Sequence, residues 1–445
     1  MEDDNTLFPL PPRVQPERPE SRGGRPRVVA PNRGQIELRS VDLDGTLPLD
    51  HRARAVWEYV QGLDLSEVYG RIRAVEGMAG RPAAAPEVVL ALWLYATVEG
   101  VGSARALDRL TEEHDAYRWL RGGVPLNYHL LADFRVEHDE LLSRLLTQSV
   151  AALMASGIVE LQRVAQDGMR VRASAGAASF RRGPALNECL QDAEEQVEAL
   201  RKELDDDPAA TSRRLKAARE RAAEDRRKRV QEALAQLPDV EAKKDAKSKD
   251  KARVSTTDPD ARVMKMGDGG YRPAYNVQFA TDTATQVIVG VSVDNQGTDQ
   301  NQLSPMIEQI RERYDEVPEE VLVDAGYTKL AEIEWVEVVE NVTVYAPVMQ
   351  PKDPTRDRHQ PMPGDSDALA AWRHRMGTDE AKEIYKERAA TAECVNAAAR
   401  NRGFRQFLVR GQRKARAIAL WYALAHNLMR TLALRAMVPV VPVAT

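Results

Sequence analysis

The sequence predicts an α/β fold, in which a mixed sheet carries an all-α N-terminal domain and an inserted helical hairpin. Residues 49–156 show a helical pattern of apolar positions, whereas residues 158–173 and 274–293 have the apolar alternation of strands. Between these two strand regions, apolar residues recur at heptad spacing within a strongly charged stretch. The first strand is therefore separated from the rest of its sheet by a helical insertion.

The N-terminal part divides into a tail and a helical domain. Residues 1–44 are rich in Pro, Arg and Gly and lack periodicity, so we expect a disordered tail. Residues 45–156 form the predicted helical domain. Within it, residues 86–100 (PEVVLALWLYATVEG) begin with Pro86 at a favoured first-turn position and carry a broad apolar face. Ser103 is the expected cap of the next, shorter helix.

Short helices follow one another beyond Ser103, with a Gly-containing turn at residues 121–129. This order is compatible with a helix-turn-helix that binds DNA and equally with an ordinary helical bundle. Four arginines of this region fit either a DNA contact or a solvated face: Arg105, Arg109, Arg118 and Arg121.

The insertion has the pattern of two antiparallel helices. Its first helix carries a seam at spacings of 4, 3, 4, 3 and 4 residues, made by Leu186, Leu190, Ala193, Val197, Leu200 and Leu204. Pro208 ends that helix, and a second charged helix is expected from residue 212 to residue 237. We therefore place the first strand of the sheet domain in residues 157–180 and the hairpin in 181–255.

The remainder of the sheet domain is predicted to occupy residues 256–435, followed by a tail at 436–445. Residues 274–293 form a β-hairpin with a turn near 282–285, and helices and short buried strands then alternate. With the insertion removed, the order is strand, strand, strand, helix, strand, helix, strand, helix. This order is that of a mixed α/β layer fold.

Composition limits the possible functions. The 445 residues include 63 basic and 68 acidic side chains, for a net charge of −5, so the overall charge does not indicate a nucleic-acid partner. The charge is uneven, however, because residues 400–416 contain seven basic side chains and no acid. Two cysteines and seven scattered histidines cannot supply a disulfide framework or a cysteine-based zinc site. No apolar stretch reaches the ~18 residues of a membrane span, so we expect a cytoplasmic protein with no membrane partner.

Three acids stand in unusual places. Asp167 and Asp324 each end an apolar run, in VAQDG and VLVDAG, and two such acids can meet at the edge of a sheet. Glu393 lies on a helix rich in small residues, where we expect it to point inward. Each acid alone is most simply a salt bridge or a cap. Together, two strand-end Asp residues and one Glu suit two Mg²⁺ (or Mn²⁺) ions, the usual arrangement for phosphodiester chemistry.

Several blocks of the chain resemble those of DDE transposases from bacterial insertion sequences, over about residues 45–435. In order they are QDGMRVRASAG…SFRRG, DPDARVMKMGDGGYRPAYNVQFATD, GTDQNQL, LVDAGY and YKERAATAECVNAAAR. The resemblance implies a ribonuclease H-like catalytic domain with Asp167, Asp324 and Glu393 as catalytic triad and metal ligands. It also implies cleavage of DNA at terminal inverted repeats and strand transfer into target DNA. A homodimer in the DNA complex and a bacterial, nucleoid-associated location follow from the same resemblance.

The resemblance extends to a Tyr, Arg, Glu, Lys signature, matched here by Tyr385, Arg388 and Glu393, with Arg400 in the Lys position. Arg388 and Glu393 stand one residue further apart than in the best-known version. On an ideal α-helix this places them ~140° apart, while Glu393 and Arg400 lie within ~20°. Arg400 is thus the better expected phosphate ligand. The predicted DNA-binding residues are Tyr385, Arg388, Arg400, Arg402, Arg410 and Arg413.

Two other classes of function remain open from the sequence. One is a catalytically inactive DNA-binding protein derived from a transposase. The other is a nuclease on the same fold, which cuts DNA without joining it.

Overall fold

The computed structural model describes residues 42–77, 81–206, 210–351, 353 and 355–437. The tails predicted at 1–44 and 436–445 therefore lie almost entirely outside the described residues. The predicted domain boundaries remain predictions, and the secondary-structure elements below are those observed.

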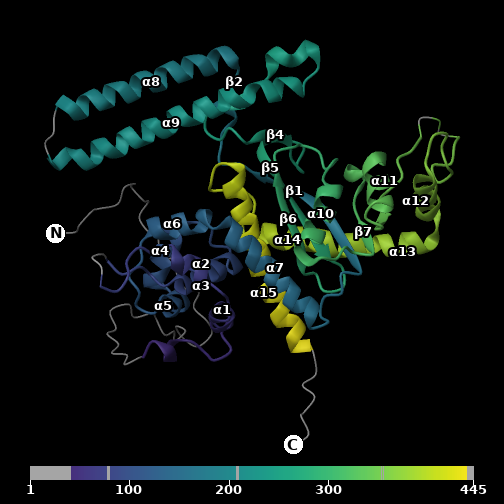
Figure 1. The fold of residues 1–445 in the computed structure, drawn as a ribbon, viewed down its shortest axis with the longest axis horizontal. Coiled ribbons are helices and arrows are strands. Elements are labelled where there is room, and N and C mark those ends of the chain that lie inside the picture. Colours follow the sequence, from purple (N-terminus) through teal and green to yellow (C-terminus); the bar gives the residue numbers. More distant parts are fainter. Residues whose placement is uncertain (1–41, 78–80, 207–209, 352, 354, 438–445) are drawn as a thin grey trace, which may run out of the picture. The chain divides into compact units, whose positions relative to one another are not determined.

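A mixed six-stranded sheet forms the centre of the fold, as expected (Figure 1). Its strands lie in the order β4-β5-β1-β7-β8, with β6 also paired to β5. Strand β5 pairs antiparallel with β1, β4 and β6, whereas β7 pairs parallel with both β1 and β8. The bounds are β1 Arg163–Arg172, β4 Arg262–Lys265, β5 Tyr271–Asp282, β6 Ile288–Asp294, β7 Glu320–Leu322 and β8 Thr343–Tyr345.

The predicted helical region is helical throughout its described part. Its helices are α1 Arg52–Gln61, α2 Ser66–Gly70, α3 Pro86–Val98, α4 Ala104–Glu113, α5 Asp115–Arg121, α6 Tyr128–Glu137 and α7 Asp139–Ala155. Pro86 stands at the start of α3, and Ser103 caps α4 by accepting from the Ala106 N–H, as expected. Helix α3 is buried along nearly its whole length, which explains its broad apolar face.

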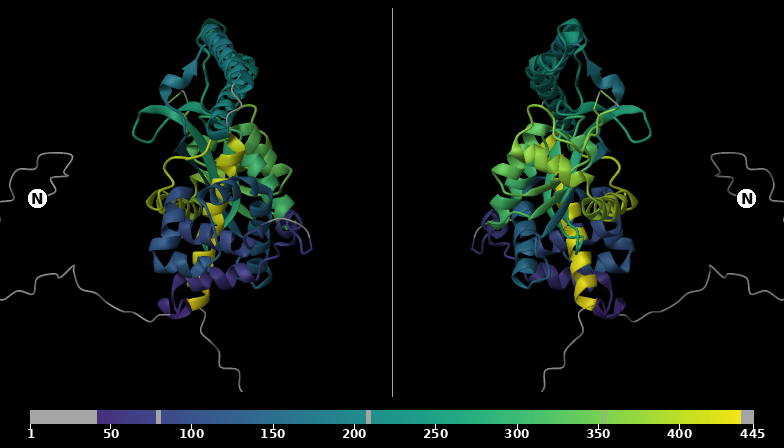
Figure 2. Two further views of the ribbon diagram at one scale, coloured as in Figure 1. Left: turned by 90° about the vertical axis from the view of Figure 1, so that its left-hand side faces the viewer. Right: turned by 90° about the vertical axis from the view of Figure 1, so that its right-hand side faces the viewer.

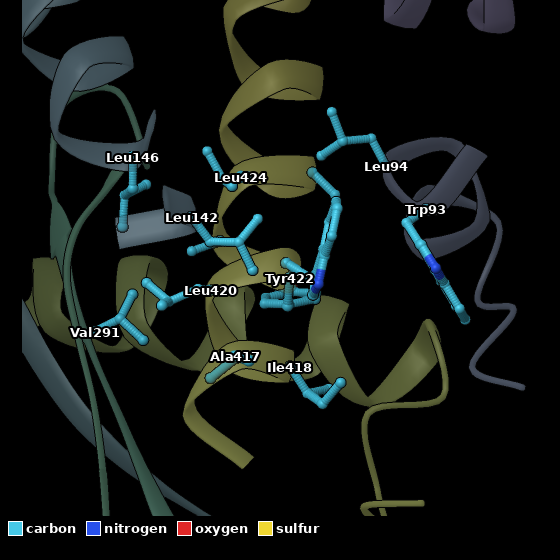
Figure 3. Close-up of a cluster of buried hydrophobic side chains, with 14 of the residues drawn as sticks. Trp93, Leu94, Leu142, Leu146, Val291, Ala417, Ile418, Leu420, Tyr422 and Leu424 are labelled. Carbon is cyan, nitrogen blue, oxygen red and sulfur yellow. The ribbon is translucent and has the colours of Figure 1, made fainter. Parts of the chain in front are cut away.

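The helical region and the sheet share one hydrophobic core. The long helix α15 (Gln412–Met437) lies between them, and Figure 3 shows Leu420, Tyr422 and Leu424 of α15 among residues of α3, α7 and β6. Trp421 of α15 also donates a 2.9 Å hydrogen bond to the Arg135 carbonyl of α6. The N-terminal helices are thus packed directly against the catalytic half of the chain.

Helices α8 (Gly183–Asp206) and α9 (Ala210–Ala242) form the expected inserted hairpin and run side by side (Figures 1 and 2). The base of the hairpin buries a small separate cluster of Leu186, Ala233, Leu237, Ala252 and Val254. Two short strands, β2 (Phe180–Arg181) and β3 (Val254–Ser255), close this base. Helix α9 extends past its predicted end at residue 237, because Leu237 and Val240 pack on this cluster and offset the penalty of Pro238.

The sheet is covered by the remaining helices, which carry residues of the candidate site. They are α10 Leu303–Tyr314, α11 Leu330–Val338, α12 Asp367–Gly377, α13 Asp379–Arg388 and α14 Cys394–Asn401. A π-helical segment at Ala389–Glu393 joins α13 to α14 without a break. Among the described residues, no helix combines the length and apolar character needed to cross a membrane.

Candidate active site

Asp167 lies in the middle of β1, which corrects the expectation that it ends a strand. Strand β1 continues to Arg172 because its antiparallel pairing with β5 extends as far as Ala274. The parallel pairing with β7 is shorter and stops where Ala165 faces Leu322. Asp167 is therefore one pleat beyond the point at which β7 ends.

Asp324 follows β7 and comes level with Asp167, because two residues separate each acid from the last Ala165–Leu322 pair. Asp167 thus stands on β1 and Asp324 just past the end of the parallel neighbour β7, so the two acids lie side by side although only Asp324 follows the end of its strand. Asp324 Oδ1 accepts a 2.7 Å hydrogen bond from the Gly326 N–H, which fixes the turn after the strand. The small residues of the DAGY block allow this turn close to the sheet.

Burial and a neighbouring charge set the electrostatics of the pair. Burial raises the pKa of Asp167 from its ordinary value of 3.8 to about 6, and the negative charge of Asp324 adds to this rise. The Arg388 guanidinium and the hydrogen bond from the Gly168 N–H act in the opposite direction on the same pKa. The two acids repel each other, so the site favours a cation between them.

Asn396 of α14 is a site residue that sequence reasoning did not identify. Its Nδ2 donates a 2.9 Å hydrogen bond to Asp167 Oδ2, while its buried Oδ1 has no hydrogen-bond partner. Asn396 thus links α14 to β1 at the acid itself. In the sequence, the only sign of this role is that Asn396 lies three residues after Glu393. Residues three apart on a helix lie on the same face.

A buried polar layer lies on the opposite face of β1, centred on Asp299. Asp299 accepts hydrogen bonds from Asn276, Gln278 and Arg170, at 2.7, 2.8 and 2.9 Å. Gly168 is required in β1 because a Cβ there would overlap Asp299 Oδ1 and Gln278 Nε2. Asp299 comes from the GTDQNQL block, for which no role was predicted from the sequence.

The helix that carries Glu393 differs from the ideal α-helix assumed from the sequence. The π-helical turn at Ala389–Glu393 absorbs the one extra residue between Arg388 and Glu393. As a result Arg388 Nη2 lies 3.3 Å from Glu393 Oε1, and the two side chains share a face. The expected ~140° separation was therefore wrong, because it relied on an uninterrupted α-helix.

Glu393 is 62% exposed at its side chain, so the expectation that it points inward was also wrong. Its described partner is Arg388, whose charge also acts on Asp167 and whose guanidinium lies 5.8 Å from the Tyr385 ring centre. Within the described residues, no three His, Cys, Asp or Glu side chains gather closely enough to hold a metal ion. Glu387 is no substitute for Glu393, since it pairs at 2.6 Å with Arg163 at the start of β1.

The predicted DNA-binding residues occupy different environments. The Tyr385 hydroxyl donates to the Val323 carbonyl at 3.1 Å and so ties α13 to the residue before Asp324. Arg400 and Arg410 are exposed, and Arg402 is half-buried. Arg413 is not free, because it binds Asp139 Oδ1 through both Nε and Nη2 at 3.0 and 2.7 Å.

Comparison with protein-family models gives two matches. Residues 242–428 match the transposase DDE domain, and residues 41–137 match a transposase domain. Searches among curated proteins and solved structures found no match. Strand β1 and most of the hairpin precede the first of these ranges, so Asp167 is placed in the site by the sheet pairing alone. The mixed sheet is that of a ribonuclease H-like domain, and the chain belongs to the DDE transposases of the insertion-sequence type.

Proposed function

We propose that this transposase cleaves DNA at the ends of its element and joins the freed 3′ ends to target DNA, with Asp167, Asp324 and Glu393 as catalytic carboxylates. The observation that carries the proposal is the level placement of Asp167, on β1, and Asp324, two residues past the last β1–β7 pair. Burial, and then the charge of Asp324, raises the pKa of Asp167, as expected for a carboxylate pair that a bound cation would stabilise.

The donor set fits divalent metal. Asp167 and Asp324 offer hard oxygen ligands, and the position already attracts positive charge, since Arg388 contacts Glu393 and acts on Asp167. Two Mg²⁺ or Mn²⁺ ions held by Asp167, Asp324 and Glu393 supply activation of the attacking oxygen and stabilisation of the leaving one. For Glu393 to join the two Asp residues, its ion pair with Arg388 must open.

The chain's own residues prepare this site. Asn396 and the Gly168 N–H each bond one oxygen of Asp167 and so fix its carboxylate plane. Tyr385 holds α13 against the end of β7, next to Asp324. Release of Arg388 from Glu393 frees a guanidinium for a DNA phosphate beside the scissile bond. Three further arginines extend this positive surface along the bound DNA strand: Arg400, Arg402 and Arg410.

We also propose that the protein acts as a homodimer on paired element ends and works in the cytoplasm on nucleoid DNA. Two alternative activities, cleavage without joining and DNA binding without catalysis, are outcomes of the experiment that tests the proposal.

The test is a strand-transfer assay with labelled element ends and a supercoiled target, run with Mg²⁺ or Mn²⁺. The wild-type protein should join the labelled ends to the target. D167N and D324N should bind the ends but neither cut nor join them, because the amide keeps the volume and removes the charge. D379N is the matched control, since Asp379 is fully solvated on α13 and pairs only with Lys382.

Each rival activity gives its own result. Nicked ends without joined product would identify a nuclease, and a shifted but uncut DNA would identify a binding protein. D167N or D324N cutting at the wild-type rate would show that these acids are not catalytic.

A further inference from the structure

A second cationic site lies at the junction of the two family-matched regions. A cavity of about 460 Å³ opens between the loop before α4, the loop after α14 and helix α15. Its walls include Ser103, Arg135, Arg402, Phe404, Arg405 and Tyr422. Three of the lining side chains are arginines, and no Asp or Glu lines the cavity. An uncompensated cluster of three guanidinium groups favours an anion.

Two of the three arginines, Arg135 and Arg402, each have one buried nitrogen without a hydrogen-bond partner. Arg135 donates to the Gly102 carbonyl and stacks on Trp93, but its buried Nε has no hydrogen-bond partner. Arg402 likewise has a buried Nη1 without a partner. Neither forms an ion pair with any carboxylate of the described residues, and burial lowers the pKa of Arg135 to about 10. Buried donors of this kind are costly unless something binds them.

The N-terminus of α4 adds to the positive electrostatic potential in the cavity. Ser103 and Ala106, in the cap and first turn of this 10-residue helix, line the cavity. Free backbone N–H groups and the positive end of the helix dipole make a helix N-terminus favourable for phosphate. The helix therefore acts with the three arginines and not as the sole feature of the site.

The cavity is tied to the catalytic strand. The loop after α14 pairs with the last residue of β1, since the Arg172 N–H donates to the Arg405 carbonyl at 3.1 Å and the Phe407 N–H donates to the Arg172 carbonyl at 2.8 Å. Arg172 is five residues beyond Asp167, roughly 17 Å along a strand. Arg402 is six residues beyond Asn396, roughly 9 Å along a helix. These lengths correspond to about three to five nucleotides at 3.4 Å per nucleotide.

We infer that this cavity binds a backbone phosphate of the DNA strand whose end lies at the catalytic acids. The inference rests on the proposed function, because it assumes that DNA reaches those acids. The cavity then acts as a fixed anchor that sets the distance between the bound phosphate and the scissile one. A phosphate contact of this kind positions the strand without reading its sequence.

The experiment measures the affinity of a duplex for full-length protein across a salt series. R402Q/R405Q should bind more weakly, and the plot of log affinity against log salt should flatten by about 0.9, the change expected for one lost phosphate contact. R402K/R405K keeps both charges and should retain most of the slope. R272Q is the matched control, since Arg272 is part-exposed and pairs with Asp268 on the β4–β5 turn. It should keep the wild-type slope.

A second arm separates DNA phosphate from a free anion. Inorganic phosphate, compared with chloride at matched ionic strength, should raise the Tm of the wild-type protein more than that of R402Q/R405Q. An R402Q/R405Q variant with wild-type affinity, slope and phosphate response would overturn the site while leaving DNA joining by the wild-type protein intact. A wild-type protein that responds to phosphate but binds no duplex would overturn DNA as the source of the anion, together with the proposed function.

Discussion

Replacing Asp167 with Asn should stabilise the folded protein at neutral pH while abolishing its activity. In the folded protein the pKa of Asp167 is raised from 3.8 to about 6, chiefly by burial and then by the charge of Asp324. Asn has nearly the same shape and no charge. The Asn396 amide can turn its unpartnered Oδ1 toward the new amide nitrogen, so the link to α14 is kept.

The sign and size of this change in stability follow from the linkage between proton binding and folding. The unfolded chain releases the Asp167 proton near pH 4, whereas the folded protein retains it until about pH 6. The folded state therefore binds more protons in this window, and the free energy of unfolding falls as pH rises through it. A pKa difference of about 2 corresponds to about 3 kcal/mol at ~1.36 kcal/mol per pKa unit. Relative to wild type, D167N should raise the free energy of unfolding by up to about 3 kcal/mol at pH 7 and by almost nothing at pH 4.

Urea unfolding of wild type and D167N at several pH values between 4 and 8 measures this difference. Titrating groups away from the site affect both proteins alike, so the difference between the two free energies isolates Asp167 and its coupling to Asp324 and Asp299. D133N should match wild type at every pH, because Asp133 is exposed on the surface of α6. A D167N effect that does not grow between pH 4 and pH 7 would refute the electrostatic account of the acid pair.

Three further changes test the surroundings of the site. Replacing residues 185–250 with a short linker should leave a cooperative unfolding transition, because the hairpin buries its own separate cluster. R413Q should lower the free energy of unfolding by about 1 kcal/mol and leave the salt slope of DNA binding unchanged, since it removes two hydrogen bonds to the buried Asp139 carboxylate and leaves it only the 3.7 Å ion pair with Arg416 among the described residues. G168A should lower the free energy of unfolding by about 1–3 kcal/mol and reduce DNA joining, because the added Cβ displaces Asp299. A G168A variant with wild-type stability would show that the buried polar layer around Asp299 rearranges without cost.

Local patterns were enough to predict the main elements of the fold. The alternation in β5 and β6, the buried run before Asp324 and the heptad seam of α8 each report on contacts within a few residues. The end of β1 was misplaced because its length depends on a partner strand more than 90 residues away, which no local pattern contains. The insertion between the two strands hides this pairing from the sequence.

The polar partners of the acids could not be predicted for a related reason. Asn396 and Asp299 look like ordinary helix and loop residues, and their roles arise only when α14 and the loop after β6 meet opposite faces of β1. A buried amide or carboxylate carries no periodic signal. It is recognised from its hydrogen bonds, which exist only in the folded chain.

The π-helical turn before α14 shows how the chain compensates for a change in spacing. One extra residue between Arg388 and Glu393 would rotate them to different faces of an α-helix, but a turn with five-residue hydrogen bonding restores their alignment. Beyond the turn the helix resumes α geometry, so Arg400, seven residues after Glu393, stays on the same exposed face. Removing one residue from 389–392 should therefore convert the π turn to α-helix and preserve the Arg388–Glu393 ion pair. The same deletion in α14, between Glu393 and Arg400, has no π turn to absorb it and should rotate Arg400 by ~100° away from the face that carries Glu393.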